Sequence, residues 1–284
     1  MEYPLTAHIT RALGDIPLVR RIEYLPTVGS TNNVAKQLGA EGAPEATLVI
    51  ADEQTAGRGR LSRAWWTPPG AAIAMSLLLR PRFPPTLAHR LTMLTGLVVV
   101  ETIEQVADLK VGLKWPNDVV INKSKIPNTC TARRRKCTQY PILKLGGILT
   151  EASVSGDEIE YVVVGLGLNV NVDFRGREDL PGATSLMMEL GREVDRLEIL
   201  RAIVERFAAR YAVIESDERL RDDWAARLVM LGRPIVARRG DESIVGQAES
   251  VDESGALLIR QDDGTLKRVD AADVTLRDTF AHPR

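Results

Sequence analysis

The side chains best suited to chemistry in this sequence are arginines in a glycine-rich segment, residues 54–63. Two glycines alternate there with Arg58 and Arg60. Glycine lets the main chain approach a ligand closely, and an arginine binds phosphate or carboxylate through paired hydrogen bonds. The segment is typical of a loop that closes over an anionic ligand, although its composition equally suits an exposed basic loop. The tryptophan pair at 65–66 can cover an apolar ligand or belong to the core.

Two further segments combine a charged side chain with a backbone that a ligand can approach. Residues 114–118 read Lys-Trp-Pro-Asn-Asp, which predicts a hairpin turn. A functional interpretation makes Asp118 a carboxylate that holds a metal ion or orients an amine. Residues 144–151 begin with Lys144 and contain two glycines, so a ligand can lie against this strand while the lysine neutralises its charge. A single lysine before a strand is also often simply solvated.

The sequence lacks the residue patterns of several common functional sites. The three histidines are scattered and form no HExxH pattern, which disfavours a histidine metal site or a Ser-His-Asp hydrolase. Residues 165–169, Gly-Leu-Gly-Leu-Asn, match only half of a dinucleotide-binding fingerprint, because the third glycine is missing. Two cysteines are too few for a disulfide-rich secreted scaffold and favour a reducing cytoplasm. No set of metal ligands is predicted.

Short apolar runs that alternate with helical patterns predict a mixed α/β domain. Strands are expected at 47–51, 71–79, 111–114, 119–121, 145–152 and 161–170. Helices are expected from Ser30 or Thr31 to Leu38, from Pro84 through Val98, and at 196–214 and 218–228. Closely spaced short strands then follow, at 234–238, 245–251, 256–260 and 266–269. We therefore expect an α/β domain over residues 1–230 and a small all-β barrel over residues 231–284.

Composition argues against several classes of protein. The chain has 284 residues and a formal net charge of −1, which disfavours a dedicated binder of nucleic acid or membrane surfaces. Its longest apolar run, residues 71–79, is too short to span a bilayer, and no secretory signal precedes it. These features predict a cytoplasmic protein.

One segment, residues 123–140, has no apolar period and interrupts the predicted domain. It carries Cys130, Cys137 and the basic run at 133–136. We interpret it as a solvated surface insertion. Zinc binding by the two cysteines would need further ligands, and the basic run leaves contact with an acidic partner or nucleic acid open.

Taken together and in this order, the segments resemble the biotin–protein ligases of the biotin–[acetyl-CoA-carboxylase] ligase type. The matching segments are residues 29–32 (Gly-Ser-Thr-Asn), 54–63, 114–118, 144–151, 165–169 and 255–264. The resemblance implies a mixed-sheet catalytic domain followed by an SH3-like barrel. It further implies an enzyme that activates biotin with ATP and Mg²⁺ to biotinyl-5′-AMP. Such enzymes then transfer biotin to a lysine of a biotin carboxyl carrier domain.

The resemblance also implies roles for individual residues. The expected catalytic residues are Arg58, Arg60, Asp118 and Lys144. The expected biotin-binding residues are Ser30, Thr31, Asn32, Gln54, Arg58, Gly59, Arg60, Lys144 and Gly147. The expected nucleotide-binding residues are Arg60, Arg63, Trp65, Asn117 and Asn169. Both reactants of the first step are anions, so nearby cations suit the reaction and no nucleophilic side chain is needed.

The sequence departs from the family pattern in two places. The arginine loop continues as Leu-Ser-Arg at 61–63 where the family usually has more arginine and glycine, so we expect loop closure of altered strength. The insertion separates Asp118 from Lys144, and Lys125 lies at about the usual distance after Asp118. Lys125 is therefore a rival for the ligand-contacting lysine. We favour Lys144 because Gly-Gly-Ile-Leu follows it closely.

Two alternative functions follow from the same segments. A lipoate–protein ligase shares the catalytic fold, but the arginine loop and the C-terminal strands favour biotin. A non-catalytic regulator that binds biotinyl-AMP would contact nucleic acid or a partner through the insertion. Bifunctional relatives carry an N-terminal winged helix-turn-helix domain, and too few residues precede Gly29 to form one. We therefore expect a monofunctional ligase that binds neither DNA nor membrane, and we leave a homodimer open.

Overall fold

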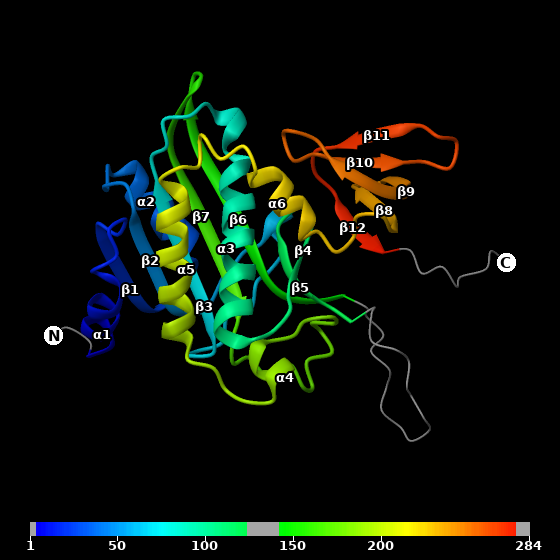
Figure 1. Ribbon diagram of the computed structural model, residues 1–284. Coiled ribbons are helices and arrows are strands. Elements are labelled where there is room, and N and C mark those ends of the chain that lie inside the picture. The colour runs from blue at the N-terminus through cyan, green and yellow to red at the C-terminus, as the bar shows by residue number, and fades with distance from the viewer. Residues whose placement is uncertain (1–3, 124–141, 277–284) are drawn as a thin grey trace.

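The computed structural model describes residues 4–123 and 142–276, which form a larger mixed sheet covered by helices and a smaller sheet beside it (Figure 1). The larger sheet has seven strands in the order β1-β2-β3-β7-β6-β5-β4. Only the β1–β2 pair is parallel, and the other neighbours are antiparallel. The mixed sheet predicted from the sequence is therefore confirmed.

The strands of this sheet include one that the sequence analysis did not predict. Their bounds are β1 Arg21–Val28, β2 Thr47–Gln54, β3 Ala72–Leu79, β4 Gly112–Lys114, β5 Asp118–Asn122, β6 Ile142–Ser155 and β7 Glu158–Asn169. Strand β1 was missed because it lies at the sheet edge and contains Pro26 and charged residues. Only Tyr24 of this strand is buried, so it carries no apolar run.

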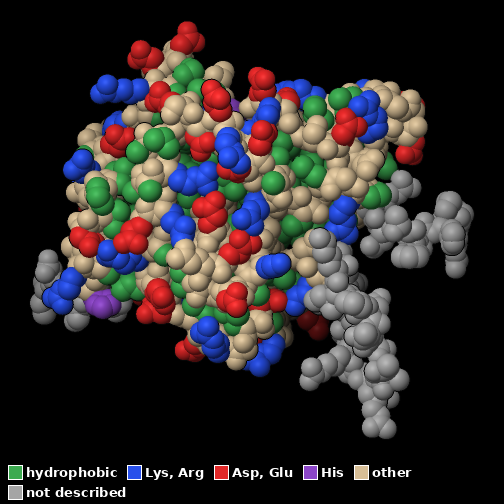
Figure 2. All heavy atoms as spheres, in the orientation of Figure 1, with side chains coloured by type: hydrophobic (Ala, Val, Ile, Leu, Met, Phe, Trp, Pro, Cys, Tyr) green, Lys and Arg blue, Asp and Glu red, His purple; other side chains and the backbone are tan. Residues whose placement is uncertain are grey.

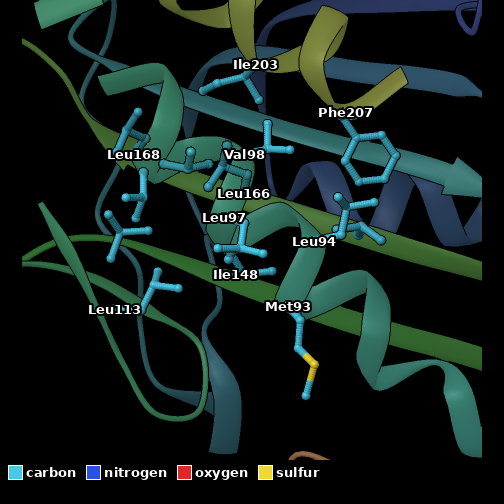
Figure 3. Packing of buried hydrophobic residues seen from close by; sticks show 14 of the residues in the cluster. Met93, Leu94, Leu97, Val98, Leu113, Ile148, Leu166, Leu168, Ile203 and Phe207 are labelled. Atoms are coloured by element: carbon cyan, nitrogen blue, oxygen red, sulfur yellow. The ribbon is translucent and has the colours of Figure 1, made fainter. Parts of the chain in front are cut away.

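Helices cover both faces of the larger sheet. Helix α3 (His89–Ala107) packs against α5 (Arg196–Tyr211) on one face. Their contact buries Leu94 and Val98 of α3 with Phe207 of α5 over the strands (Figure 3). Shorter helices are α1 Pro4–Leu13, α4 Leu186–Leu190 and α6 Leu220–Ala226. Helix α2 (Thr31–Ala40) packs on the opposite face, where it contacts β2, β3 and β7.

The segment Pro85–Ala107, which contains α3, is long and apolar enough to cross a membrane by length and composition. In the fold it lies between the sheet and α5, and most of its apolar side chains are buried there. The apolar composition of α3 is therefore explained by its place in the protein core.

The C-terminal strands form an open sheet, so the predicted closed barrel is wrong. The strands are β8 Pro234–Arg239, β9 Glu242–Val251, β10 Leu257–Arg260, β11 Leu266–Val269 and β12 Asp273–Leu276. They pair antiparallel in the order β11-β10-β9-β8-β12. Closure would require β11 to pair with β12, but these four-residue strands lie at opposite edges. The sequence analysis missed β12, whose pairing partner β8 lies far away in the chain.

The smaller sheet is fixed against the larger one beside the β4–β5 hairpin. The indole of Trp115, which is 1% exposed, donates a hydrogen bond to the carbonyl oxygen of Gly255 at 2.8 Å. Gly255 has a φ of +79°, and a β-carbon there would overlap Met93 of α3. This junction places the start of β12 next to the loop that follows β2.

Candidate active site

A cavity of about 290 Å³ lies where the two sheets meet. Its walls come from the start of α2, the loop after β2, the β4–β5 turn, strands β6 and β7, and the start of β12. The structure brings together in this lining every site residue that the sequence analysis named, which are Ser30, Thr31, Asn32, Gln54, Arg58, Gly59, Arg60, Arg63, Trp65, Asn117, Asp118, Lys144, Gly147 and Asn169. The rival Lys125 and the rest of the insertion lie outside the described residues.

One end of the cavity is a floor of hydrogen-bonding groups at the start of α2. Gln54 Oε1 accepts hydrogen bonds from Thr31 N at 2.9 Å and from Thr31 Oγ1 at 3.1 Å. The hydroxyl of Ser76 on β3 lies 2.8 Å from Thr31 Oγ1 and 2.6 Å from Asn32 Oδ1. Ser30 takes the N-cap position of α2 without a side-chain capping bond, so its hydroxyl remains available to a ligand.

Ser76 is a supporting residue that the sequence analysis missed. It is 0% exposed, and its side chain contacts both Thr31 and Asn32. Its only sequence signal is a single hydroxyl inside an otherwise apolar strand, AIAMSLLL. Such a residue is placed by its neighbours in space, which a strand pattern does not reveal.

We expect the Ser76→Ala variant to lower the free energy of unfolding by about 1–3 kcal/mol, because two buried polar groups would lose a partner. Urea denaturation of the full chain measures this change. The matched control is Ser153→Ala, whose hydroxyl bonds the exposed carboxylate of Glu160, and we expect a change within about 0.5 kcal/mol. Equal stability losses in the two variants would contradict the role given to Ser76.

Two glycines of β7 let side chains lie directly on the strand. A β-carbon at Gly165 would overlap the amide of Asn32, and one at Gly167 would overlap the indole of Trp65. In the sequence this pair matched half of a dinucleotide fingerprint and one segment of the ligase pattern. β7 continues through the pair to Asn169, so the helix that a dinucleotide fingerprint requires does not follow it. The glycines serve side-chain packing across the cavity wall.

Three polar atoms of this lining are buried without a hydrogen-bond partner among the described residues. They are Arg58 Nε, Trp65 Nε1 and Asn169 Oδ1. A buried polar atom without a partner is costly, and a ligand in the cavity is a natural source of the missing bonds. The set contains two donors and one acceptor, so it suits a ligand with mixed polarity.

Another part of the lining carries Lys144, Arg60 and the carboxylate of Asp118. Lys144 Nζ lies 2.7 Å from Asp118 Oδ1 and 5.5 Å from the centroid of the Trp65 ring. Strands β5 and β6 make this possible, because their register shift sets Asp118 opposite Gly147 and beside Lys144. Arg60 reaches the amide oxygen of Asn117 at 3.4 Å.

Burial disfavours the charged form of two cationic side chains in the cavity. It lowers the pKa of Arg60, although the nearby carboxylates of Asp273 and Asp118 act in the opposite direction. Burial likewise lowers the pKa of Lys114, which lines the cavity at the start of the 114–118 segment. No role was predicted for Lys114 from the sequence. An anion in the cavity would favour the charged form of both side chains.

The arginine loop closes one side of the cavity through backbone and side-chain contacts. Gly59 N donates to Arg63 O at 2.7 Å, around a short 3₁₀ turn whose Leu61 has a φ of 54°. Arg58 forms a hydrogen bond with Asn33 of α2. Arg63 pairs with Asp273 at the start of β12, so the loop joins the two sheets.

Cationic side chains outnumber carboxylates in the cavity lining. Five cationic side chains line it, Arg58, Arg60, Arg63, Lys114 and Lys144, against the three carboxylates of Asp118, Asp179 and Asp273. On the face that α3 and α5 cover, side chains of both signs are mixed (Figure 2). The described residues contain no group of three or more His, Cys, Asp or Glu side chains that could hold a metal ion.

This arrangement suits a ligand with two different ends. The floor offers hydrogen bonds to a neutral polar group, and the cations attract carboxylate or phosphate. Cations held in a half-enclosed space favour the joining of two anionic reactants, because they reduce the repulsion between those reactants. The cavity is therefore equipped for chemistry between a carboxylate and a phosphate ester.

Comparison with known proteins agrees with this geometry. Residues 24–169 match the biotin/lipoate A/B protein ligase family, and residues 230–277 match the biotin protein ligase C terminal domain. The bifunctional ligase/repressor BirA of Bacillus subtilis (strain 168) is 34% identical over 260 residues, which cover 89% of this chain and 73% of that protein. A biotin–[acetyl-CoA-carboxylase] ligase of Paracoccus denitrificans is 34% identical over 247 residues, which cover 83% and 92% of the two chains.

A solved structure extends the likeness to three dimensions. The biotin protein ligase from Aquifex aeolicus, in complex with biotin and ATP, has a TM-score of 0.70 and 27% sequence identity, and the match covers 91% of this chain and 99% of that one. The sequence matches span both sheets, and the structural match includes their arrangement. The chain belongs to the biotin/lipoate A/B protein ligase family, and within it to the biotin protein ligases.

Proposed function

We propose that this protein is an ATP-dependent biotin–protein ligase that acts on a biotin carboxyl carrier domain of a carboxylase. In the first step the biotin carboxylate attacks the α-phosphorus of ATP, which forms biotinyl-5′-AMP and releases pyrophosphate. In the second step the amine of the carrier lysine attacks the activated carbonyl, and AMP leaves. The observation that carries the proposal is the pairing of a polar floor with a cluster of cations in one cavity.

The first step places two anions in contact, and the cavity cations make this contact favourable. Lys144 has three ammonium hydrogens and gives one to Asp118, so the others are free to bind the biotin carboxylate and the α-phosphate. Arg58 and Arg60 add charge from the loop side of the cavity. Fixed cations of this kind stabilise the charge that builds up on the phosphorane-like transition state.

The nucleotide side of the cavity is assigned to the residues nearest the loop and β7. The indole of Trp65 provides an aromatic face for the base. Asn169 supplies a buried acceptor oxygen that fits an exocyclic N–H donor. Asn117, whose amide oxygen lies 3.4 Å from Arg60, and Arg63 complete the residues assigned to the nucleotide.

Mg²⁺ fits the cavity as an ion held by one carboxylate and the phosphates of the nucleotide. Mg²⁺ is usually bound in this way, through one or two carboxylates and substrate oxygens, without a complete protein cage. Asp118 is the residue that would hold it, since this carboxylate lies next to the proposed phosphate position. When bound, the ion neutralises phosphate charge.

The second step needs a neutral amine beside the activated carbonyl. Asp118 is the carboxylate suited to orient the carrier lysine and to accept its proton. Its Oδ1 is bonded to the ammonium group of Lys144, so Oδ2 is the oxygen assigned to the carrier's amine. The loop residues that cover the cavity exclude water, which protects the mixed anhydride from hydrolysis.

The proposal predicts labelling of a carrier domain. The full chain is incubated with biotin, Mg-ATP and a biotin carboxyl carrier domain, and the product is detected by avidin blot. We expect labelling that requires ATP and the carrier lysine. A carrier domain that a known biotin ligase labels and this protein leaves unlabelled would contradict the proposed acceptor.

A further inference from the structure

The polar floor of the cavity rests on a carboxylate that does not itself line the cavity. Glu151 lies on β6, and 24% of its side chain is exposed. Its Oε1 accepts a hydrogen bond from Lys36 Nζ at 2.9 Å, and its Oε2 accepts one from Asn32 Nδ2 at 2.9 Å. The same Oε2 lies 3.7 Å from the guanidinium of Arg58. One carboxylate thus joins helix α2, the arginine loop and the floor.

The contacts of Asn32 determine which way its amide points. Its Nδ2 faces the carbonyl oxygen of Leu149 at 3.2 Å and the carboxylate of Glu151. Both neighbours only accept hydrogen bonds, so the amide nitrogen must be on their side. Oδ1 then faces the hydroxyl of Ser76 at 2.6 Å.

This orientation limits what Asn32 can offer a ligand. Both hydrogens of its amide nitrogen are used, one by Leu149 and one by Glu151. The oxygen has two lone pairs, and Ser76 occupies one of them. Asn32, which lines the cavity, therefore presents an acceptor and no donor.

The ionised form of Glu151 maintains the arrangement. Burial raises the pKa of this carboxyl, but the hydrogen bonds from Asn32 and Lys36, with the charges of Lys36 and Arg58, outweigh burial and lower the pKa overall. A carboxylate accepts hydrogen bonds at both oxygens, so it cannot tolerate the reversed amide, whose oxygen would face it.

We propose that Glu151 is a positioning residue that sets ligand selectivity, because it holds the Asn32 amide with its oxygen over Gly165 in the cavity wall. An acceptor at that place selects ligands that donate an N–H group. The inference rests on the proposed function and adds to it that the ureido ring of biotin, which has two N–H donors, meets the floor. The dithiolane ring of lipoate has no such donor, so the same acceptor disfavours it.

The test compares substitutions of Glu151 in the full chain. Glu151→Leu keeps much of the volume and removes both acceptors, which frees the Asn32 amide to turn. We expect the KM for biotin in pyrophosphate exchange to rise about tenfold, with the KM for ATP and kcat within about twofold of the unaltered chain. Glu151→Gln retains one acceptor for Asn32, and we expect its biotin KM to lie between those of the other two proteins.

The matched control is Lys36→Gln. This substitution removes the partner of Oε1 and leaves the bond between Oε2 and Asn32 intact, so we expect a biotin KM within about twofold of the unaltered chain. A purely structural role of Glu151 would lower the melting temperature and the active fraction without separating the two KM values.

Each remaining outcome has a distinct meaning. An unchanged biotin KM in Glu151→Leu, or an equal rise in the KM values for biotin and ATP, overturns the positioning role. Biotin binding is also measured directly by calorimetry, which does not require turnover. An unaltered chain with neither biotin binding nor biotin-dependent exchange overturns the proposed function, and the inference about Glu151 fails with it.

Discussion

Replacing Lys144 with alanine is expected to lower kcat/KM for adenylate formation by a factor of about 10²–10³, the usual loss when a fixed charge-stabilising donor is removed. Lys144 Nζ is the cation nearest to Asp118 and lies over the Trp65 ring, so it stands between the proposed biotin and nucleotide positions. No other described lysine of the cavity except Lys114 offers an ammonium group there. Biotin-dependent exchange of pyrophosphate into ATP measures the effect.

The control for this prediction is Lys125→Ala, which removes the rival lysine of the insertion. We expect this variant to keep the exchange rate of the unaltered chain within about twofold, because Lys144 itself lines the cavity and is closely followed by Gly147, which also lines it. Thermal melting of both variants separates a catalytic loss from unfolding, since Lys144→Ala also leaves the Asp118 carboxylate unpaired. A loss in Lys125→Ala with normal exchange in Lys144→Ala would show that the lysine assignment is wrong.

The second large effect is expected for Gly167→Ala. A β-carbon at this position of β7 would overlap Nε1 and Cε2 of Trp65, so the indole must leave its place on the strand. We expect the KM for ATP to rise about tenfold, and overpacking to cost about 1–3 kcal/mol of stability. Nucleotide titration in the exchange assay and urea denaturation measure the two effects.

Gly29→Ala is the matched control for this glycine substitution. A β-carbon at Gly29 has no heavy atom within 4 Å, so the same chemical change meets open space. We expect a KM for ATP close to that of the unaltered chain. If Gly167→Ala also leaves this KM unchanged, Trp65 has no part in holding the nucleotide.

The sequence predicted the local elements well where apolar pattern and turn signals agreed. The buried strand expected at 71–79 is β3, and the hairpin expected around residues 114–118 is formed by β4 and β5. The helix expected at 196–214 is α5, Arg196–Tyr211. These elements depend on periodicity over a few turns or one tight connection, which a single sequence carries.

Features that depend on pairing between distant segments were missed. Closure of the C-terminal strands requires a particular partner for each edge, and the open order β11-β10-β9-β8-β12 follows from the β8–β12 pairing. The supporting role of Ser76 requires β3 to lie under the start of α2. The two glycines of β7 acquire their meaning only from Asn32 and Trp65, which cross the strand from elsewhere in the chain.

The candidate site itself was predicted through resemblance more than through spacing. Its residues come from segments as far apart as Ser30 and Asn169, and the fold gathers all of them around one cavity. Lys114 and Asp273 were not predicted as site residues, since a lysine before a turn and an aspartate in a short strand carry no distinctive pattern. The roles of the individual residues remain predictions that the substitutions above test.

The central claim is that this cavity joins biotin to the nucleotide of ATP. The most direct measurement is the exchange of labelled pyrophosphate into ATP by the full chain with Mg²⁺, with biotin, with lipoate and without either acid. The account predicts exchange that depends on biotin and is far slower with lipoate, because the acceptor oxygen of Asn32 needs an N–H donor. Exchange with lipoate and none with biotin would contradict the account.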